Sequence, residues 1–320
     1  MHEIHDYGFY VPNYLKIKTK LDGLQNFKLR KYQKDFIKFI QGIKGPKRII
    51  VLKPRQAGFS TLCASYFAHK MFTEEHYNGI AMADKHDRTQ AIGNIYRTYL
   101  NELPDLLKPM IAINNSEQLL LDNPNEKLRN KRAGLSSGMI FETANDPNAG
   151  RSSSRLFAHL SETAFYRYHK EIDDGIQNSI PLSSNTCIIK ESTANGRAGI
   201  GKSFYDLWNN AKSGDSIYQA FFVAWYEVDD YYIRPDNSFK LEKNEKELIK
   251  ENPQINHGNL LWRRLKLKEY QNGDSSEANS ILSPEERFLQ DFPHNDVTAF
   301  LSTGAPVFNQ MKLSLLINVL

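Results

Sequence analysis

The stretch "RIIVLKPRQAGFSTLCASYFAHKMF" (residues 48–72) carries the clearest structural signal in this chain of 320 residues. It opens on a short β-branched run, 48–52, which is typical of a buried strand. A loop that contains Gly58 follows, and residues 60–72 place apolar side chains at helical spacing. A strand, a tight loop and a helix in this order predict one unit of an α/β sheet.

Strands and helices alternate along most of the chain on both sides of this unit. Further strands are predicted at 79–83, 138–144, 155–160, 185–193 and 218–226, and helices at 29–42, 87–103 and 203–212. This alternation predicts a mainly parallel, doubly wound sheet. Residues 1–28 show no clear periodicity, and residues 111–155 look irregular or hairpin-like around the strand that they contain.

After about residue 230 the sequence changes character. Short charged helices are predicted at 241–254, 259–270 and 283–293. We therefore expect a core domain over 1–230, a small helical subdomain over 231–300 and the start of a linker over 301–320.

Composition narrows the class of protein. An apolar run of about 18 residues is absent, so we expect no membrane span. The two cysteines, Cys63 and Cys187, have no Cys or His partner at metal-binding spacing, which argues against zinc or a disulfide framework and fits a reducing cytoplasm. The formal net charge of +4 permits a polyanionic partner without requiring one.

The loop itself has the elements of an anion site. A helix N-terminus presents free N–H groups to phosphate, and a glycine lets the backbone approach closely. The usual phosphate-binding loop is G-x-x-x-x-G-K-[ST]. Here Phe59 follows Gly58 in place of the lysine, the nearest lysine is Lys53 at the front of the loop, and Ser60 stands where the usual loop places its Mg²⁺-binding hydroxyl. The alternative is a strand–loop–helix turn with surface charges. The candidate nucleotide-binding residues are Lys53, Pro54, Arg55, Gln56, Ala57, Gly58, Phe59, Ser60 and Thr61.

"KPRQAGFST" (53–61) is similar to the variant loop of the large terminase subunits, the DNA-packaging ATPases of tailed bacteriophages. In that family the lysine is often moved to the front of the loop, and an aromatic residue can follow the glycine. The resemblance implies a RecA-like P-loop ATPase fold of the ASCE class, ATP and Mg²⁺ as cofactors, and Lys53 as the displaced phosphate lysine.

"LFAHLSETAF" (156–165) resembles the second half of such a site, an apolar strand that ends in an acidic residue. Glu162 would be the general base that orients the attacking water. Ser161 replaces the aspartate that helps to hold Mg²⁺ in most P-loop enzymes, so its hydroxyl would be a weak ligand beside Ser60. Without the loop upstream, Glu162 would be taken for a surface carboxylate at a strand end.

"ESTANG" (191–196) resembles the strand end that couples hydrolysis to movement in large terminases. Ser192, Thr193 and Asn195 are short polar groups that can sense a phosphate through hydrogen bonds. The same residue types also favour an ordinary turn at a strand end.

Two further assignments come from the resemblance. Gln33, in the helix before the first strand, would read the adenine edge, with Tyr32 walling the base, although a Gln on an amphipathic helix is usually a solvated one. Arg151 would enter a neighbour's site as an arginine finger. Arg155 is the competitor for that role, and a plain surface arginine is the alternative for both.

The resemblance covers roughly residues 29–310 and implies a motor that drives double-stranded DNA into a procapsid, gripping the phosphate backbone without regard to sequence. Implied partners are a homo-oligomeric ring, the portal and the small terminase subunit, in the host cytoplasm and not in the mature virion. Basic stretches at 125–132 and 262–268 are candidate DNA-facing surfaces, although a solvated charged face explains either one.

The alternatives are a helicase-like ATPase and a nucleotide-binding scaffold with a degenerate site. A helicase needs a second RecA-like core, for which residues 230–320 are too short and too helical. Large terminases usually carry a nuclease domain with metal-binding aspartates. The Asp pairs 173/174 and 229/230 are interpreted as a solvated helix start and a loop, so we expect ATP hydrolysis without DNA cleavage from this chain.

Overall fold

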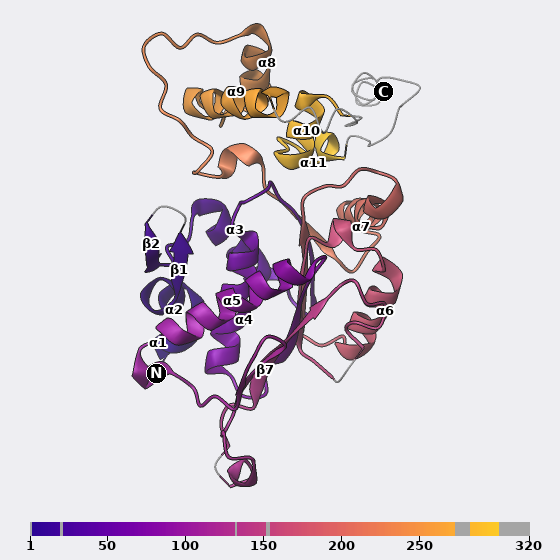
Figure 1. Ribbon diagram of the computed structural model, residues 1–320. Coiled ribbons are helices and arrows are strands. Elements are labelled where there is room, and N and C mark those ends of the chain that lie inside the picture. Colours follow the sequence, from indigo (N-terminus) through magenta and orange to yellow (C-terminus); the bar gives the residue numbers. More distant parts are fainter. Residues whose placement is uncertain (1, 20–21, 132, 152–153, 273–281, 301–320) are drawn as a thin grey trace.

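A computed structural model describes residues 2–19, 22–131, 133–151, 154–272 and 282–300 (Figure 1). Within these residues, one large sheet has the strand order β10-β3-β9-β8-β4-β7-β6-β5. The strands from β10 to β7 are parallel, and β6 and β5 add an antiparallel edge. The bounds are β10 Gln219–Phe222, β3 Lys47–Leu52, β9 Cys187–Ser192, β8 Phe157–Ser161, β4 Asn78–Ala83, β7 Ser137–Thr143, β6 Gln118–Leu121 and β5 Ile113–Asn114. The predicted mainly parallel α/β sheet is confirmed.

Helices cover both faces of this sheet, with α3, α4 and α5 on one side and α6 and α7 on the other (Figure 1). Their bounds are α3 Lys31–Gly42, α4 Phe59–Thr73, α5 His86–Glu102, α6 His169–Ser179 and α7 Lys202–Ser213. Alternate side chains of a strand point to opposite faces. In β3, Ile49 and Val51 accordingly join the core under α4, whereas Ile50 and Leu52 join the core under α6 and α7. Both faces are buried, which is the doubly wound arrangement that the sequence predicts.

The N-terminal residues, which show no periodicity, form short elements beside α4. These are α1 His2–His5, α2 Tyr7–Tyr14, β1 Lys16–Thr19 and β2 Gly23–Asn26. The Tyr7 hydroxyl lies 2.6 Å from Ser65 Oγ on α4, and Lys16 pairs with Glu102 at 3.3 Å. Elements of four to eight residues, one of them a helix with Pro12 inside it, are too short to show a repeat.

The last part of the described chain is helical and lies over the carboxyl ends of the strands (Figure 1). Its helices are α8 Lys243–Glu251, α9 His257–Asn272, α10 Pro284–Asp291 and α11 Asp296–Ala299. Trp208 of α7 donates its indole N–H to Asp296 Oδ2 at 2.9 Å, which ties α11 to the sheet layer. The boundaries at 230 and 300 stay a prediction, and the predicted linker, 301–320, lies outside the described residues.

The predicted strand over 218–226 is shorter in the structure, because β10 ends at Phe222. The aromatic run continues into a 3-10 helix, Trp225–Glu227. Trp225 is fully buried there and stacks on Trp262 of α9 at a centroid distance of 5.7 Å. The apolar residues at 223–226 therefore serve the contact with the helical segment and not a longer strand.

Candidate nucleotide-binding site

The loop between β3 and α4 has the backbone of an anion site. Gly58 caps the fifteen-residue helix α4 with φ of 67°, a conformation that glycine adopts without strain. Gln56 also has a positive φ, 57°, which is uncommon outside glycine and tends to occur at functional sites. The helix begins at Phe59, one residue before the predicted start. Its first N–H groups face the space above the loop, where phosphate is favoured.

The side chain of Phe59 packs in the hydrophobic core and not toward the loop. Its side chain is 1% exposed and packs against Phe36 and Phe221, with ring centroids 5.0 and 6.4 Å away. An aromatic ring in that position has no access to phosphate, so this residue can offer a nucleotide only its backbone N–H. The position after the glycine is thus a packing position here, and the loop's cation must come from elsewhere.

Lys53, at the front of the loop, is the candidate for that cation. Its Nζ lies 2.7 Å from Glu162 Oε1 and 3.2 Å from Glu191 Oε2. Strand β9 lies between β3 and β8, so the lysine at the end of β3 reaches across β9 to the carboxylate that follows β8. Burial by itself would lower the pKa of the Lys53 ammonium, but the two carboxylates outweigh burial and raise it. The group is therefore a fixed positive charge.

Glu191 is a part of this site that the sequence analysis missed. Its side chain is fully buried, and Ser60 Oγ donates to its Oε1 at 2.7 Å. Burial would raise the pKa of Glu191, but the Lys53 charge and contacts from His159 and Ser161 hold it well below its ordinary value. His159 Nε2, from the middle of β8, lies 3.5 Å from Glu191 Oε1. An acidic residue inside an apolar strand is itself a signal, because such a residue needs a partner.

Glu162 follows β8 in the left-handed region, with φ of 57°. The coupling residues predicted from "ESTANG" surround it. Ser192 Oγ accepts from the Ala164 N–H at 3.1 Å and lies 3.5 Å from Glu162 Oε2, and Asn195 Nδ2 donates to the Ala164 carbonyl at 3.0 Å. Thr193, between them, is buried. The end of β9 and the turn after Glu162 are therefore joined by hydrogen bonds.

The donor set fits Mg²⁺. Ser60 Oγ and Ser161 Oγ lie 3.3 Å apart, and the Glu191 carboxylate adjoins them. These are hard oxygen donors, which Mg²⁺ prefers, and it usually binds one or two carboxylates together with phosphates and waters. The described part of the chain has no cluster of three or more His, Cys, Asp or Glu side chains that could hold a metal ion.

The predicted adenine residues adjoin the loop with some of their groups already engaged. Gln33 Oε1 accepts from the Arg30 N–H at 3.0 Å, and its Nε2 faces Gly58. Tyr32 donates its hydroxyl to the Ala57 carbonyl at 2.6 Å and stacks on Phe59. Gln33 can therefore offer a base its amide donor, whereas the acceptor end caps its own helix.

The remaining loop residues differ in exposure. Pro54 and Ala57 are buried, Arg55 is exposed, and Thr61 lies half-buried in the first turn of α4. Arg55 is held by the helical segment: its Nε pairs with Asp291 Oδ1 at 2.6 Å, its N–H donates to the Asp291 carbonyl at 2.9 Å, and its own carbonyl accepts from the Tyr231 hydroxyl. The end of α10 therefore rests directly on the loop.

The two finger candidates are placed very differently. Arg155 is 2% exposed, and its guanidinium lies 3.8 Å from Glu142 and 3.5 Å from the Gly150 carbonyl, which makes it an internal residue. Arg151 is exposed in the loop that follows β7, with Nη1 3.3 Å from Asn148 Oδ1. Its side chain packs beside α6, where a Cβ on Gly175 would lie 2.9 Å from Arg151 Cγ. Arg151 is therefore a surface residue at the side of α6.

No family model matches the sequence. Among solved structures, the large terminase of bacteriophage HK97 superposes with a TM-score of 0.57 at 16% identity, over 98% of this chain and 58% of that one. The chain has the fold of that terminase. It spans well under two thirds of the HK97 protein's length. The large terminase ATPase domain of Thermus phage P74-26 matches with a TM-score of 0.48 at 15% identity, over 74% of this chain and 92% of that one. The large terminase of the thermophilic phage D6E, in complex with ADP, gives 0.45 at 10% identity, over 70% and 50%. These two likenesses are too distant to add to the fold assignment.

The shared fold does not identify a DNA-binding surface, so the two basic stretches are considered by their own contacts. In the basic stretch 262–268, Arg264 pairs with Glu245 on α8, and the Arg263 guanidinium lies over the Phe288 ring at 5.4 Å. These arginines hold α9 to its neighbours, although within 262–268 only Leu267 is buried and Leu265 and Lys268 are exposed. In the other basic stretch, residues 125–131 are described: Arg129 Nη1 lies 3.9 Å from Glu126, and Glu126–Leu128 forms a 3-10 turn.

One acidic pair differs from its sequence interpretation. Asp173 lies within α6, half-buried, and pairs with the buried Lys190 at 2.6 Å, so it is an internal ion-pair partner and not part of a solvated helix start. Asp229 and Asp230 are exposed in a loop as expected, with Asp230 paired to Arg30.

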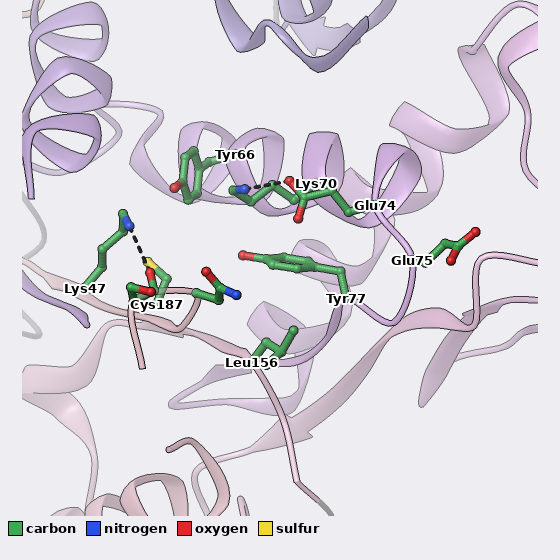
Figure 2. A pocket seen from close by; sticks show the side chains of 10 residues that line it. Lys47, Tyr66, Lys70, Glu74, Glu75, Tyr77, Leu156 and Cys187 are labelled. Carbon is green, nitrogen blue, oxygen red and sulfur yellow. Dashed lines mark hydrogen bonds and ion pairs between the residues drawn. The ribbon is translucent and has the colours of Figure 1, made fainter. Parts of the chain in front are cut away.

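A pocket lies at the amino ends of the parallel strands. This pocket of about 370 Å³ is formed at the start of β3 and β9 and the end of α4, as Figure 2 shows with Lys47, Cys187 and Lys70. Lys70 pairs with Glu74 at 2.7 Å, and Lys47 Nζ donates to the Ser184 carbonyl at 3.3 Å. The nucleotide-site residues follow the carboxyl ends of the same strands, so this pocket is separate from them. No helix among the residues that the structure describes is long and apolar enough to cross a membrane.

Proposed function

We propose that this chain binds ATP with Mg²⁺ at the loop between β3 and α4, hydrolyses it, and uses it to translocate double-stranded viral DNA into a procapsid. The observation that carries the proposal is the meeting of Lys53 and Glu162, 109 residues apart in sequence, at 2.7 Å above the N-terminus of α4. A phosphate lysine and a general base are the two groups that the usual loop and strand end would contribute. Here the lysine arrives from the front of the loop.

The chemistry follows from these contacts. The N-terminal N–H groups of α4 and the Lys53 ammonium bind the phosphates, so Lys53 exchanges at least one carboxylate for phosphate oxygens when nucleotide enters. Glu162, released from that ion pair, accepts a hydrogen bond from the attacking water and orients it. Ser60 would hold Mg²⁺, which would supply charge neutralisation at the phosphate oxygens. The unit formed by Ser192, Asn195 and the Ala164 backbone then transmits a change at Glu162 to the end of β9.

The assembly is part of the proposal. Arg151 is exposed at the surface of its own chain, which suits an arginine that completes a neighbour's site in a homo-oligomeric ring. The DNA contact is to the phosphate backbone, and the portal and small terminase subunit are the expected partners in the host cytoplasm. The motor role rests on fold analogy with the HK97 terminase, whereas the ATP site rests on the geometry above.

The test is nucleotide binding and hydrolysis in three variants measured beside the parent. Lys53→Ala should lose nucleotide affinity, and Glu162→Gln should bind ATP but hydrolyse it slowly. Lys47→Ala, at the opposite end of the same strand, is the matched control and should behave like the parent. ATP hydrolysis at the parent rate in both site variants would remove the assignment.

The ring is tested by mixing variants. Arg151→Ala and Lys53→Ala subunits, each inactive alone, should regain part of the ATPase activity when mixed, because a mixed interface combines an intact arginine with an intact loop. Mixtures no more active than their parts would exclude a finger at Arg151. DNA affinity should fall steeply with salt and be the same for unrelated sequences.

A further inference from the structure

The ATP site has a carboxylate in a place where its sequence motif lacks one. In P-loop NTPases the strand end before the general base provides an aspartate for Mg²⁺. This chain has Ser161 there. In the β8–β9 pair, however, Ser161 is the register partner of Glu191, so the two residues lie side by side on neighbouring parallel strands. A carboxylate is therefore present at the same level of the sheet, carried by the next strand.

We propose that Glu191 is the protein carboxylate that holds the Mg²⁺ of the ATP site, directly or through a water, in place of an aspartate at position 161. This inference rests on the proposed ATP site. Glu191 Oε1 accepts from the Ser60 hydroxyl at 2.7 Å, so the carboxylate already contacts the side chain that the loop provides for the metal. Its Oε2 lies 3.2 Å from Lys53 Nζ without a well-aligned hydrogen bond, which leaves acceptor capacity on that oxygen.

The charge of the cluster points the same way. One ammonium, Lys53, faces two carboxylates, Glu162 and Glu191, which gives +1 − 2 = −1 for the three side chains. Glu191 has no exposure to water, so its charge cannot be balanced by solvent. When phosphate draws Lys53 away, the deficit of positive charge grows, and a divalent cation between the phosphates and Glu191 balances it.

The competing explanation is that Glu191 is a structural counterion of Lys53 and touches no metal. The two explanations differ in what happens to the metal dependence of nucleotide binding. If Glu191 is a metal ligand, it increases the gain in nucleotide affinity that the metal brings. If it is only a counterion of Lys53, it changes nucleotide affinity equally with and without metal, since the lysine contacts phosphate in both cases.

The experiment measures the affinity for ATPγS by calorimetry in EDTA and in Mn²⁺, and counts bound Mn²⁺ from the loss of the free-ion EPR signal. In the parent, Mn²⁺ should strengthen binding. In Glu191→Gln that gain should fall by about tenfold or more, the usual cost of losing a group that supports a bound metal. Affinity in EDTA should stay the same or rise, because Lys53 is then less tightly held. Glu245→Gln, which removes another buried carboxylate, one that pairs with Arg264 far from the loop, is the control and should keep the full gain.

A rescue separates a metal role from a folding defect. Adding Ser161→Asp to the Glu191→Gln variant returns a carboxylate to the neighbouring strand and should restore most of the Mn²⁺-dependent gain. Should Glu191→Gln not fold, Glu191→Asp keeps the charge but shortens its reach, and a loss of gain is again expected. An unchanged gain in the Glu191 variants would overturn the inference and leave the ATP site standing, whereas a parent that binds no nucleotide under either condition would overturn both.

Discussion

Replacing Lys53 with methionine should destabilise the protein in a way that depends strongly on pH. The side chain of methionine has nearly the length of the lysine stem, so the change removes a charge with little change of shape. It leaves the buried carboxylate of Glu191, which has no exposed surface, without its positive partner and next to Glu162, which is 19% exposed. Removing one partner of a buried ion pair is much more costly than never having the pair, because an uncompensated charge remains.

The size of the effect follows from the two contacts. At 2.7 and 3.2 Å, and with an effective dielectric constant of about 20, the attractions of Lys53 to Glu162 and Glu191 are about 6 and 5 kcal/mol before desolvation is subtracted. Net losses on breaking one buried pair are about 3–5 kcal/mol, and we expect a loss in that range at pH 7.5.

The pH dependence has a definite sign. In the parent, the pKa of Glu191 is depressed, so its contribution to stability is present above its unfolded value of 4.5 and is lost only as pH falls toward the folded value. Without Lys53, the largest effect that lowers the pKa of Glu191 is gone, and only His159 and Ser161 oppose the effect of burial. We therefore expect the pKa of Glu191 to rise in the variant and its stability to fall as pH rises above 4.5, by up to about 1.4 kcal/mol per pH unit while the carboxyl titrates. The gap between parent and variant should therefore widen from pH 5 to pH 8.

The assay is urea unfolding followed by tryptophan fluorescence at pH 5, 6, 7 and 8, in EDTA and without nucleotide. Lys190→Met is the matched control, because Lys190 is as buried as Lys53 but its partner Asp173 is 30% exposed and can take up water. The double variant Lys53→Met with Glu191→Gln should recover part of the loss. A loss in Lys53→Met that is independent of pH, or no larger than in Lys190→Met, would refute the reasoning.

Three further predictions concern the loop and the base. Glu162→Gln should retain ATPγS binding while the hydrolysis rate falls by at least about 100-fold, and a fall in binding as large as the fall in rate would contradict a base at this position. Gly58→Ala should lower the free energy of unfolding by about 1–2 kcal/mol and weaken nucleotide binding, because a φ of 67° disfavours a side chain although space for one exists. Gly42→Ala, where φ is not positive, is the control, and both variants are measured by calorimetry. Phe59→Ala should lower stability by about 3–5 kcal/mol in urea unfolding, and a loss below 1 kcal/mol would show that the ring is not a core element.

The contact between Lys53 and Glu162 could largely be predicted from the sequence, because each of these residues follows an apolar strand. The carboxyl ends of parallel strands meet at one edge of a sheet, so two polar residues in those positions are expected near each other. The alternation of 48–52 and 155–160 with helical segments was enough to predict that edge. What the pattern did not contain was the strand order, which places β9 between the two.

Glu191 and His159 were missed for that reason. Each is a polar residue in an apolar run, and the partner that neutralises it lies on a neighbouring strand whose register the sequence does not state. Asp173 was misjudged on the same ground, since its partner Lys190 is on another element. The contact between Arg55 and Asp291, 236 residues apart, is likewise a product of tertiary packing alone.

The contact between Arg55 and Asp291 connects the loop directly to the end of α10. Arg55 holds Asp291 through its side chain and its backbone, and Asp291 Oδ2 also accepts from the Tyr270 hydroxyl at 2.7 Å. A ligand that drew the guanidinium inward would break the ion pair with Asp291 and leave the backbone hydrogen bond from the Arg55 N–H and the Tyr270 hydroxyl to hold that residue. The position of these last helices therefore depends on what the loop binds, although the loop lies more than two hundred residues earlier in the sequence. A small displacement of the loop at the phosphates would be passed through Asp291 to α10.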